Sequence, residues 1–166
     1  MTYHNKVYVS MDADNDLHYY RLMKAWKQND NIGFNFYDAH DINMIYDASE
    51  ASIKAGLQER FRSSKAFVLL VGDHTKYLYK YVRWEIEQAI KRDLPCIVVN
   101  INGKRSCDNY LCPALIRDHL AIHISFNAKI LQYALENWPT SYERHKRDGD
   151  AGPYFYKSDV YEKLGL

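Results

Sequence analysis

Residues 66–72, Ala-Phe-Val-Leu-Leu-Val-Gly, form the most hydrophobic run of the sequence. The run from Ala66 to Val71 is apolar throughout and does not alternate with polar residues, which is typical of a parallel strand covered by helices on both faces. We therefore expect this run in the middle of a sheet, with the rest of the chain arranged around it.

Further apolar runs on both sides of this segment predict the remaining strands, at residues 7–11, 34–37, 95–101 and 120–124. Between the runs, apolar residues recur at helical spacing. The predicted helices carry these stripes at residues 19–26, 53–61, 82–90 and 130–138. Strands that alternate with helices imply a parallel sheet with right-handed crossovers, and five strands favour the flavodoxin-like order 2-1-3-4-5. The predicted fold class is α/β, a three-layer sandwich.

The length of 166 residues fits one domain. Pro139 is expected to end the last predicted helix, because proline lacks the N–H that a helix interior needs. We therefore place the domain at residues 1–138 and treat residues 139–166 as a C-terminal extension packed on it.

Composition and charge argue against several classes of partner. The net charge is +1, so no global field is present to hold a nucleic acid or a membrane surface. The N-terminal residues lack a signal-peptide pattern, and no stretch approaches the about 18 apolar residues of a membrane span. We expect a cytoplasmic protein. Cys96, Cys107 and Cys112 are odd in number and lack CxxC spacing, so neither a disulfide nor a zinc site is predicted.

The predicted topology indicates where a ligand would bind. In such sheets ligands bind beyond the carboxyl ends of the strands, at the switch point between the first and third strands. On a helical wheel started at Val82, Glu85 lies at the margin of the apolar stripe, where a partly desolvated functional acid would sit. Alternatively, Glu85 is a surface residue paired with Arg92 or a lysine. Trp84, on the far side of the wheel, would contact a partner or lie under the C-terminal extension.

Acidic residues in the loops after the first and third predicted strands raise a second possibility, the chemistry of a phospho-acceptor receiver domain. Asp12, Asp14 and Asp16 follow the first strand and Asp73 ends the third, as in phospho-acceptor receiver domains. The rest of that machinery is missing, because no Ser or Thr ends the fourth strand and no Lys closes the fifth. The alternative role for these aspartates is loop solvation and helix capping.

Two segments carry a resemblance to a known family. They are residues 61–72, FRSSKAFVLLVG, and residues 80–86, KYVRWEI. Both resemble the TIR-like domains of bacterial Thoeris antiphage systems, of the ThsB type. Residues 7–10 and 96–101 agree with that pattern, and the resemblance covers about residues 5–126. It implies the TIR-like form of the flavodoxin-like sandwich.

The resemblance also implies an activity. In that family the Glu on this helix cleaves the N-glycosidic bond between nicotinamide and ribose in NAD, and only Glu85 matches it. The implied enzyme is a hydrolase, an NAD glycohydrolase or ADP-ribosyl cyclase. Its product would be an ADP-ribose-derived, cyclic second messenger for a separate effector protein. NAD is then the substrate, and no cofactor or metal is expected.

Other site residues and partners are expected with it. Ser10 and Asp12 are candidates for contacts to ribose or phosphate, and Phe36, Tyr37 and Tyr81 are candidates for stacking on a base. The resemblance further implies assembly into a TIR–TIR homo-oligomer and a phage protein as the trigger.

Two other function classes remain open at this point. A non-catalytic TIR-like interaction module would keep the sheet and use Trp84 and the helix surfaces for assembly. A nucleoside deoxyribosyltransferase-like enzyme shares the sheet type and a catalytic Glu, but it would process free nucleosides instead of NAD.

Overall fold

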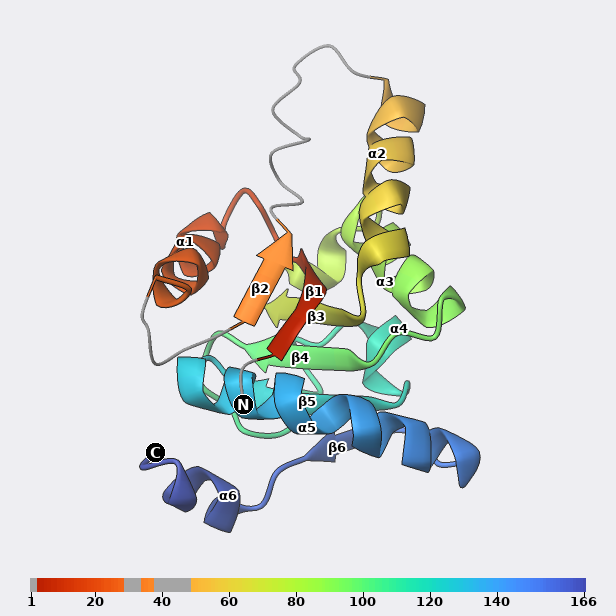
Figure 1. Cartoon of the computed structure of the whole chain (residues 1–166). Coiled ribbons are helices and arrows are strands. Elements are labelled where there is room, and N and C mark those ends of the chain that lie inside the picture. The colour runs from red at the N-terminus through yellow and green to blue at the C-terminus, as the bar shows by residue number, and fades with distance from the viewer. Residues whose placement is uncertain (1–2, 29–33, 38–48) are drawn as a thin grey trace.

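The computed structural model describes residues 3–28, 34–37 and 49–166 (Figure 1). One all-parallel sheet forms the middle layer, with six strands in the order β2-β1-β3-β4-β5-β6. The strands are β1 (Tyr3–Ser10), β2 (Phe34–Tyr37), β3 (Ala66–Val71), β4 (Cys96–Asn100), β5 (Ala121–Ser125) and β6 (Pro153–Phe155). The helices are α1 (Leu17–Trp26), α2 (Glu50–Ser63), η2 (Thr75–Tyr77), α3 (Val82–Lys91), α4 (Ala114–Arg117), α5 (Ala128–Arg147) and α6 (Ser158–Lys163).

The α/β class and the all-parallel sheet were predicted from the sequence, but the sheet has one strand more than the five predicted. The additional strand, β6, pairs with β5 at the edge of the sheet. It has only three residues, and Pro153 and Phe155 are exposed while Tyr154 is half-buried. An edge strand this short is not distinguished from a loop by its sequence pattern.

Strand β3 lies in the middle of the sheet and supplies core residues to both faces, as its apolar run predicts. Ala66, Val68 and Leu70 belong to the core on the side of α1 and α5. Phe67, Leu69 and Val71 belong to the core on the side of α2, α3 and α4. The two cores and the sheet between them make up the three layers of the sandwich.

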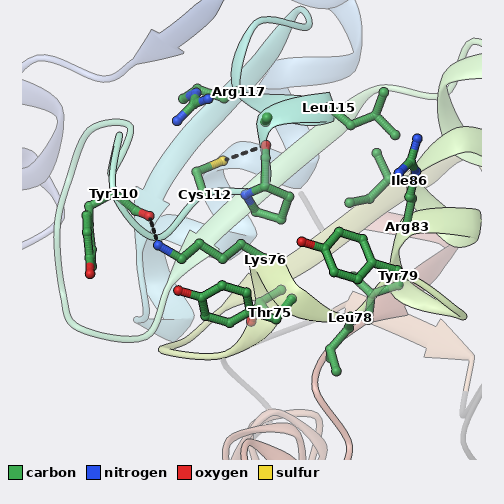
Figure 2. A pocket seen from close by; sticks show the side chains of 14 residues that line it. Thr75, Lys76, Leu78, Tyr79, Arg83, Ile86, Tyr110, Cys112, Leu115 and Arg117 are labelled. Atoms are coloured by element: carbon green, nitrogen blue, oxygen red, sulfur yellow. Dashed lines mark hydrogen bonds between the residues drawn. The ribbon is translucent and has the colours of Figure 1, made fainter.

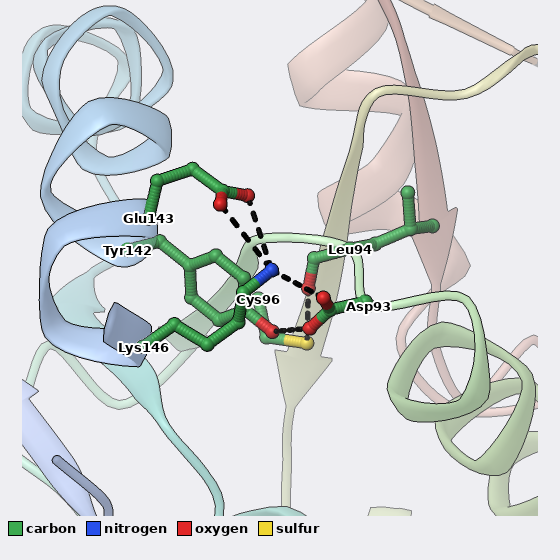
Figure 3. Close-up of polar contacts among 6 residues, drawn as sticks. All are labelled: Asp93, Leu94, Cys96, Tyr142, Glu143 and Lys146. Carbon is green, nitrogen blue, oxygen red and sulfur yellow. Dashed lines mark hydrogen bonds and ion pairs between the residues drawn. The ribbon is translucent and has the colours of Figure 1, made fainter. Parts of the chain in front are cut away.

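Helix α5 runs through Pro139, so the predicted helix end at this residue is wrong and the predicted boundary at 138/139 falls inside the helix. Contacts beyond the proline explain why the helix continues. Tyr142 is buried, and its hydroxyl donates to Asp93 Oδ1 at 2.8 Å. Lys146 forms an ion pair with the other oxygen of Asp93 and one with Glu143 (Figure 3). These anchors offset the hydrogen bond that the proline removes.

The C-terminal segment packs on the face of the sheet that carries α1 and α5. Tyr161 of α6 is 0% exposed and belongs to that core, and its hydroxyl accepts a hydrogen bond from the Ser125 N–H at 3.3 Å. Trp84 packs against Phe61 on the opposite face, with the Lys54 ammonium 5.7 Å from its ring centroid. The prediction that the C-terminal segment covers Trp84 is therefore wrong.

No helix among the described residues combines the length and the apolar character that a membrane span requires.

Replacing Tyr161 with Ala tests whether the C-terminal segment is part of the cooperative fold. The substitution empties a fully buried aromatic site, so we expect it to lower the free energy of unfolding by about 3 to 5 kcal/mol in urea titrations. Tyr161→Phe removes only the hydroxyl and should lower it by about 1 kcal/mol. The matched control is Phe155→Ala, which changes a side chain that is 60% exposed. Equal stabilities of the Tyr161→Ala and Phe155→Ala variants would contradict an integrated segment.

Candidate functional site

Glu85 lies in the first turn of α3 and is only 4% exposed. The sequence placed it at the margin of the apolar stripe, whereas the structure buries it with Val82 and Ile86. Its neighbour on the helix, Glu87, is exposed and pairs with Arg83 at 3.1 Å. Two carboxylates on one helix thus have opposite environments, and only Glu85 points into the protein.

The carboxylate of Glu85 is held by two hydroxyl groups of β1. The Tyr8 hydroxyl donates to Oε2, and the Ser10 hydroxyl donates to Oε1 at 3.1 Å. Tyr8 and Ser10 are two residues apart, so their side chains lie on the same face of the strand. The prediction of a surface Glu85 paired with Arg92 or a lysine is therefore wrong, because the partners of the carboxylate are neutral hydroxyls.

These surroundings change the acidity of Glu85. Burial raises the pKa of Glu85 to about 7, and the hydrogen bonds from Tyr8 and Ser10 oppose that rise. Burial and the nearby carboxylate together raise the pKa of Tyr8 far above its usual range, so the phenol stays a donor. Close to neutral pH, Glu85 is then present in both its protonated and its ionised form.

Tyr8 is the site residue that the sequence reasoning missed. Its ring stacks on Phe61 of α2, with centroids 3.8 Å apart and an interplanar angle of 11°, and it also contacts Phe67. This packing fixes the position of the phenol oxygen beneath α3. The available signal was a tyrosine between Val7 and Val9, two residues before Ser10, which puts two hydroxyls on one face of the strand.

The sequence-predicted residues Ser10 and Asp12 occupy different environments. Ser10 contacts Glu85, whereas the carboxylate of Asp12 is turned into its own loop. Asp12 Oδ1 accepts from the N–H groups of Asp14 at 3.0 Å and Asn15 at 3.3 Å, and Oδ2 accepts from the Asn15 side chain at 2.7 Å. The side chain is 1% exposed. This geometry favours the loop-structuring role over a receiver-type metal site.

The two loops at the switch point are joined by Asp16 and Gly72. A Cβ atom at Gly72 would lie 2.4 Å from Asp16 Oδ2, so any other residue here would displace the Asp16 carboxylate. Burial, followed by the charge of Asp12, raises the pKa of Asp16. The carboxylate of Asp16 in the loop after β1 thus lies directly against the backbone of the loop after β3.

The stacking candidates can be placed only in part. Tyr81 is half-buried directly before α3, its carbonyl accepts from the Glu85 N–H at 2.8 Å, and the Lys80 ammonium is 5.3 Å from its ring centroid. The backbones of Phe36 and Tyr37 pair with β1, but their side chains lie outside the described part of the structure. Of the five predicted binding residues, Ser10 is in contact with Glu85 through its side chain.

A cavity of about 640 Å³ adjoins α3 (Figure 2). Val82 and Ile86 form part of its wall, whereas Glu85 is not among the lining residues. Its other lining residues are Arg83 on α3 and residues of two segments, 75–79 and 110–117 around α4. They include the aromatic residues Tyr77, Tyr79 and Tyr110 and the cations Lys76, Arg83 and Arg117.

The sandwich and its buried carboxylate define a class of protein, a doubly wound α/β domain with an acid at the switch point of the sheet. A comparison with protein-family models identifies the family. The model for the TIR-like domain of the Thoeris protein ThsB matches residues 3–106. The chain belongs to this family of the Thoeris antiphage system. The matched region contains β1, α3 and the two residues, Tyr8 and Ser10, whose hydroxyls donate to the Glu85 carboxylate.

Replacing Glu85 with Gln tests its raised pKa through the pH dependence of stability. The folded state binds the Glu85 proton more tightly than the unfolded state, so this group stabilises the fold at low pH and loses that contribution as pH rises toward 7. The neutral glutamine has no such dependence. Between pH 4.5 and pH 8, we expect the free energy of unfolding of the Glu85→Gln variant to rise by about 3 kcal/mol relative to that of the wild type. This value follows because one pKa unit corresponds to about 1.4 kcal/mol.

The measurement is a series of urea titrations at several pH values. Glu87→Gln is the matched control, because it removes a carboxylate from the exposed side of the same helix. Its difference from the wild type should be small and nearly constant with pH. A Glu85→Gln difference that is equally flat would show that the carboxyl has an ordinary pKa.

Proposed function

We propose that this chain cleaves the N-glycosidic bond between nicotinamide and ribose in NAD and converts the ADP-ribose portion into a cyclic signalling nucleotide. The observation that carries this proposal is the buried Glu85, held by two hydroxyls at the switch point of a TIR-like sheet. The family to which the chain belongs supports it, because that family is linked to NAD processing.

The chemistry suits an anionic group in a desolvated place. As the bond from ribose C1′ to nicotinamide breaks, its electron pair leaves with nicotinamide and C1′ becomes an oxocarbenium-like cation. An ionised Glu85 stabilises that cation, as carboxylates do in glycoside hydrolysis. Water then attacks C1′ and loses a proton, which gives ADP-ribose. If an adenine nitrogen of the same molecule attacks instead, the product is cyclic.

The neighbouring groups have separate roles in this proposal. The hydroxyls of Tyr8 and Ser10 favour the ionised form of Glu85, because hydrogen bonds to a carboxylate lower its pKa. Ser10 also lies at the carboxyl end of β1, where its hydroxyl can exchange from Glu85 to a ribose hydroxyl. Tyr81 is placed one turn before Glu85 and offers a ring for base stacking. Phe36 and Tyr37 are proposed for the same task.

Asp12 has a supporting role in the same proposal. Its carboxylate organises the loop that follows Ser10, so it would position backbone groups toward ribose or phosphate. Around this site, the proposal includes a separate effector that responds to the nucleotide, assembly of TIR-like domains into a homo-oligomer, and a phage protein as the trigger.

The second candidate function is a non-catalytic interaction module, which two observations favour. Both oxygens of Glu85 are already hydrogen-bonded inside the protein. In addition, large exposed side chains surround the cavity next to α3, as at many protein interfaces. These side chains are Tyr77, Tyr79, Tyr110 and Leu115.

NAD turnover by matched variants distinguishes the candidate functions. We expect the wild type to release nicotinamide and to form ADP-ribose or a product lighter by one water, identified by mass spectrometry. Glu85→Gln should lower kcat/KM by at least about 100-fold, because the electrostatic stabilisation of the cation is lost. Glu87→Gln on the same helix should keep wild-type activity.

The assay is performed on the purified chain and on lysates of cells with and without phage infection, since assembly is part of the proposal. No NAD loss in any of these states would overturn the enzyme and leave the interaction module. Cleavage of free nucleosides in preference to NAD would instead indicate a nucleoside deoxyribosyltransferase-like enzyme.

The pH profile tests the roles of the hydroxyls. Because the ionised Glu85 is the active form, kcat/KM for NAD should rise with pH through an apparent pKa of about 7. Tyr8→Phe and Ser10→Ala each remove a hydrogen bond that favours the ionised form, so each should move this midpoint upward, by about one unit. A downward shift or no shift in both variants would contradict the assigned roles.

A further inference from the structure

Three potential metal ligands meet on the side of the sheet that carries α4. Cys107 and Cys112 lie in the loop between β4 and α4, and His123 lies on β5. The two Sγ atoms and one ring nitrogen lie within 4.8 Å of one another. The cysteine spacing alone did not predict this group, because its third member comes from a strand 11 residues after Cys112.

His123 is the most unusual member of the group. It is 0% exposed, and neither of its ring nitrogens has a hydrogen-bond partner among the described residues. Burying a polar group without a partner costs free energy, so an orphaned imidazole in a core calls for an explanation. Burial also favours the neutral ring, which carries a lone pair on one nitrogen. Such a nitrogen can bind a metal ion directly.

The loop that carries the two cysteines is held in a defined shape. The Asp108 carboxylate accepts from the N–H groups of Tyr110 at 3.0 Å and Leu111 at 2.9 Å, and the Asp108 carbonyl accepts from the Cys112 N–H at 2.9 Å. This single turn brings Cys107 and Cys112 to the same place. The Asn100 side-chain amide, which donates to two carbonyls of residues 104–106, fixes the start of the loop.

We propose that Cys107, Cys112 and His123 form a binding site for a thiophilic divalent metal ion, with Zn²⁺ as the fitting ion. Two thiolates and an imidazole are typical zinc ligands, and Zn²⁺ takes a fourth ligand in a tetrahedral arrangement. Cys107 is only half-buried, so the fourth position is supplied by water or another exogenous group. The ion would tie the β4–α4 loop to β5.

Charge and distance agree with this assignment. Zn²⁺ with two thiolates and a neutral imidazole has no net charge, so the group suits a site with little solvent. With Zn–S bonds of about 2.3 Å, two sulfurs in a tetrahedral site lie about 3.8 Å apart. The ligand atoms, within 4.8 Å of each other, reach that geometry through small side-chain movements.

A disulfide between Cys107 and Cys112 is the competing fate of the same thiols. It would leave both nitrogens of His123 without a partner, whereas a metal ion gives one of them a ligand bond. The orphaned histidine therefore favours the metal. This site is separate from the Glu85 site, whose carboxylate accepts hydrogen bonds from Tyr8 and Ser10 of β1. Cys112 also lines the cavity beside α3, so a bound ion would fix that wall.

Metal titration of the reduced, full-length chain tests the proposal. We expect one Zn²⁺ per chain by mass spectrometry under native conditions and a rise of the melting temperature with Zn²⁺. Co²⁺ should give the thiolate-to-metal charge-transfer band and the intense visible bands of a tetrahedral site. Because these measurements use the wild type, their outcome does not depend on whether a variant folds.

Cys112→Ser and His123→Gln should weaken Zn²⁺ binding by more than the about 10- to 100-fold that outer-shell changes cause. Cys96→Ala is the matched control, because Cys96 is a buried thiol on the same face that donates to the Leu94 carbonyl and lies outside the cluster. It should keep the stoichiometry. No Co²⁺ thiolate band in the reduced wild type would overturn the proposal. A Co²⁺ thiolate band that stays intact in the Cys112→Ser variant would also overturn it.

Discussion

The burial of the Glu85 carboxylate against β1 is the constraint on which the other features of the site depend. A carboxylate removed from water requires hydrogen-bond donors, and Tyr8 and Ser10 supply them from one face of one strand. The phenol of Tyr8 must then be held in place, and the stack with Phe61 does this. Helix α3, strand β1 and helix α2 are thus linked through one acid.

Burying the Glu85 carboxylate lowers the stability of the fold, but it keeps a negative charge in a desolvated place. A hydrophobic residue at position 85 would relieve the desolvation penalty, but it could not respond to a developing positive charge. Hydroxyl donors stabilise the ionised form without adding a formal charge, so they leave the negative charge available to a cationic transition state. An arginine or lysine partner would have lowered the pKa of Glu85 more than the hydroxyls do, and it would have neutralised the negative charge. The neutral partners of Glu85 therefore fit a catalytic role better than an ion pair would.

Much of the sheet could be predicted from the sequence, because a strand covered on both faces must be apolar throughout, as residues 66–71 are. The failures have physical causes. Pro139 is tolerated because Tyr142 and Lys146 anchor the helix beyond it. Strand β6 lies at an edge and has only three residues, too few for a recognisable strand pattern. At the site, Glu85 followed from helical periodicity and from the family resemblance. Tyr8 did not, because its role depends on a contact with a residue 77 positions away.

The two faces of the sheet differ in the buried polar groups that they carry. On one face, α5 and α6 close an apolar core that contains Trp138, Tyr142 and Tyr161. On the other face lie two polar groups that a purely structural core would not need, Glu85 and His123, and the His123 ring has no hydrogen-bond partner in the described ranges. Groups of this kind lower stability unless ligands or chemistry use them, so they can be kept only where the rest of the fold is firmly packed. The packing of α5 and α6 on the first face adds buried apolar surface that offsets this cost, while α2, α3 and α4 cover the second face.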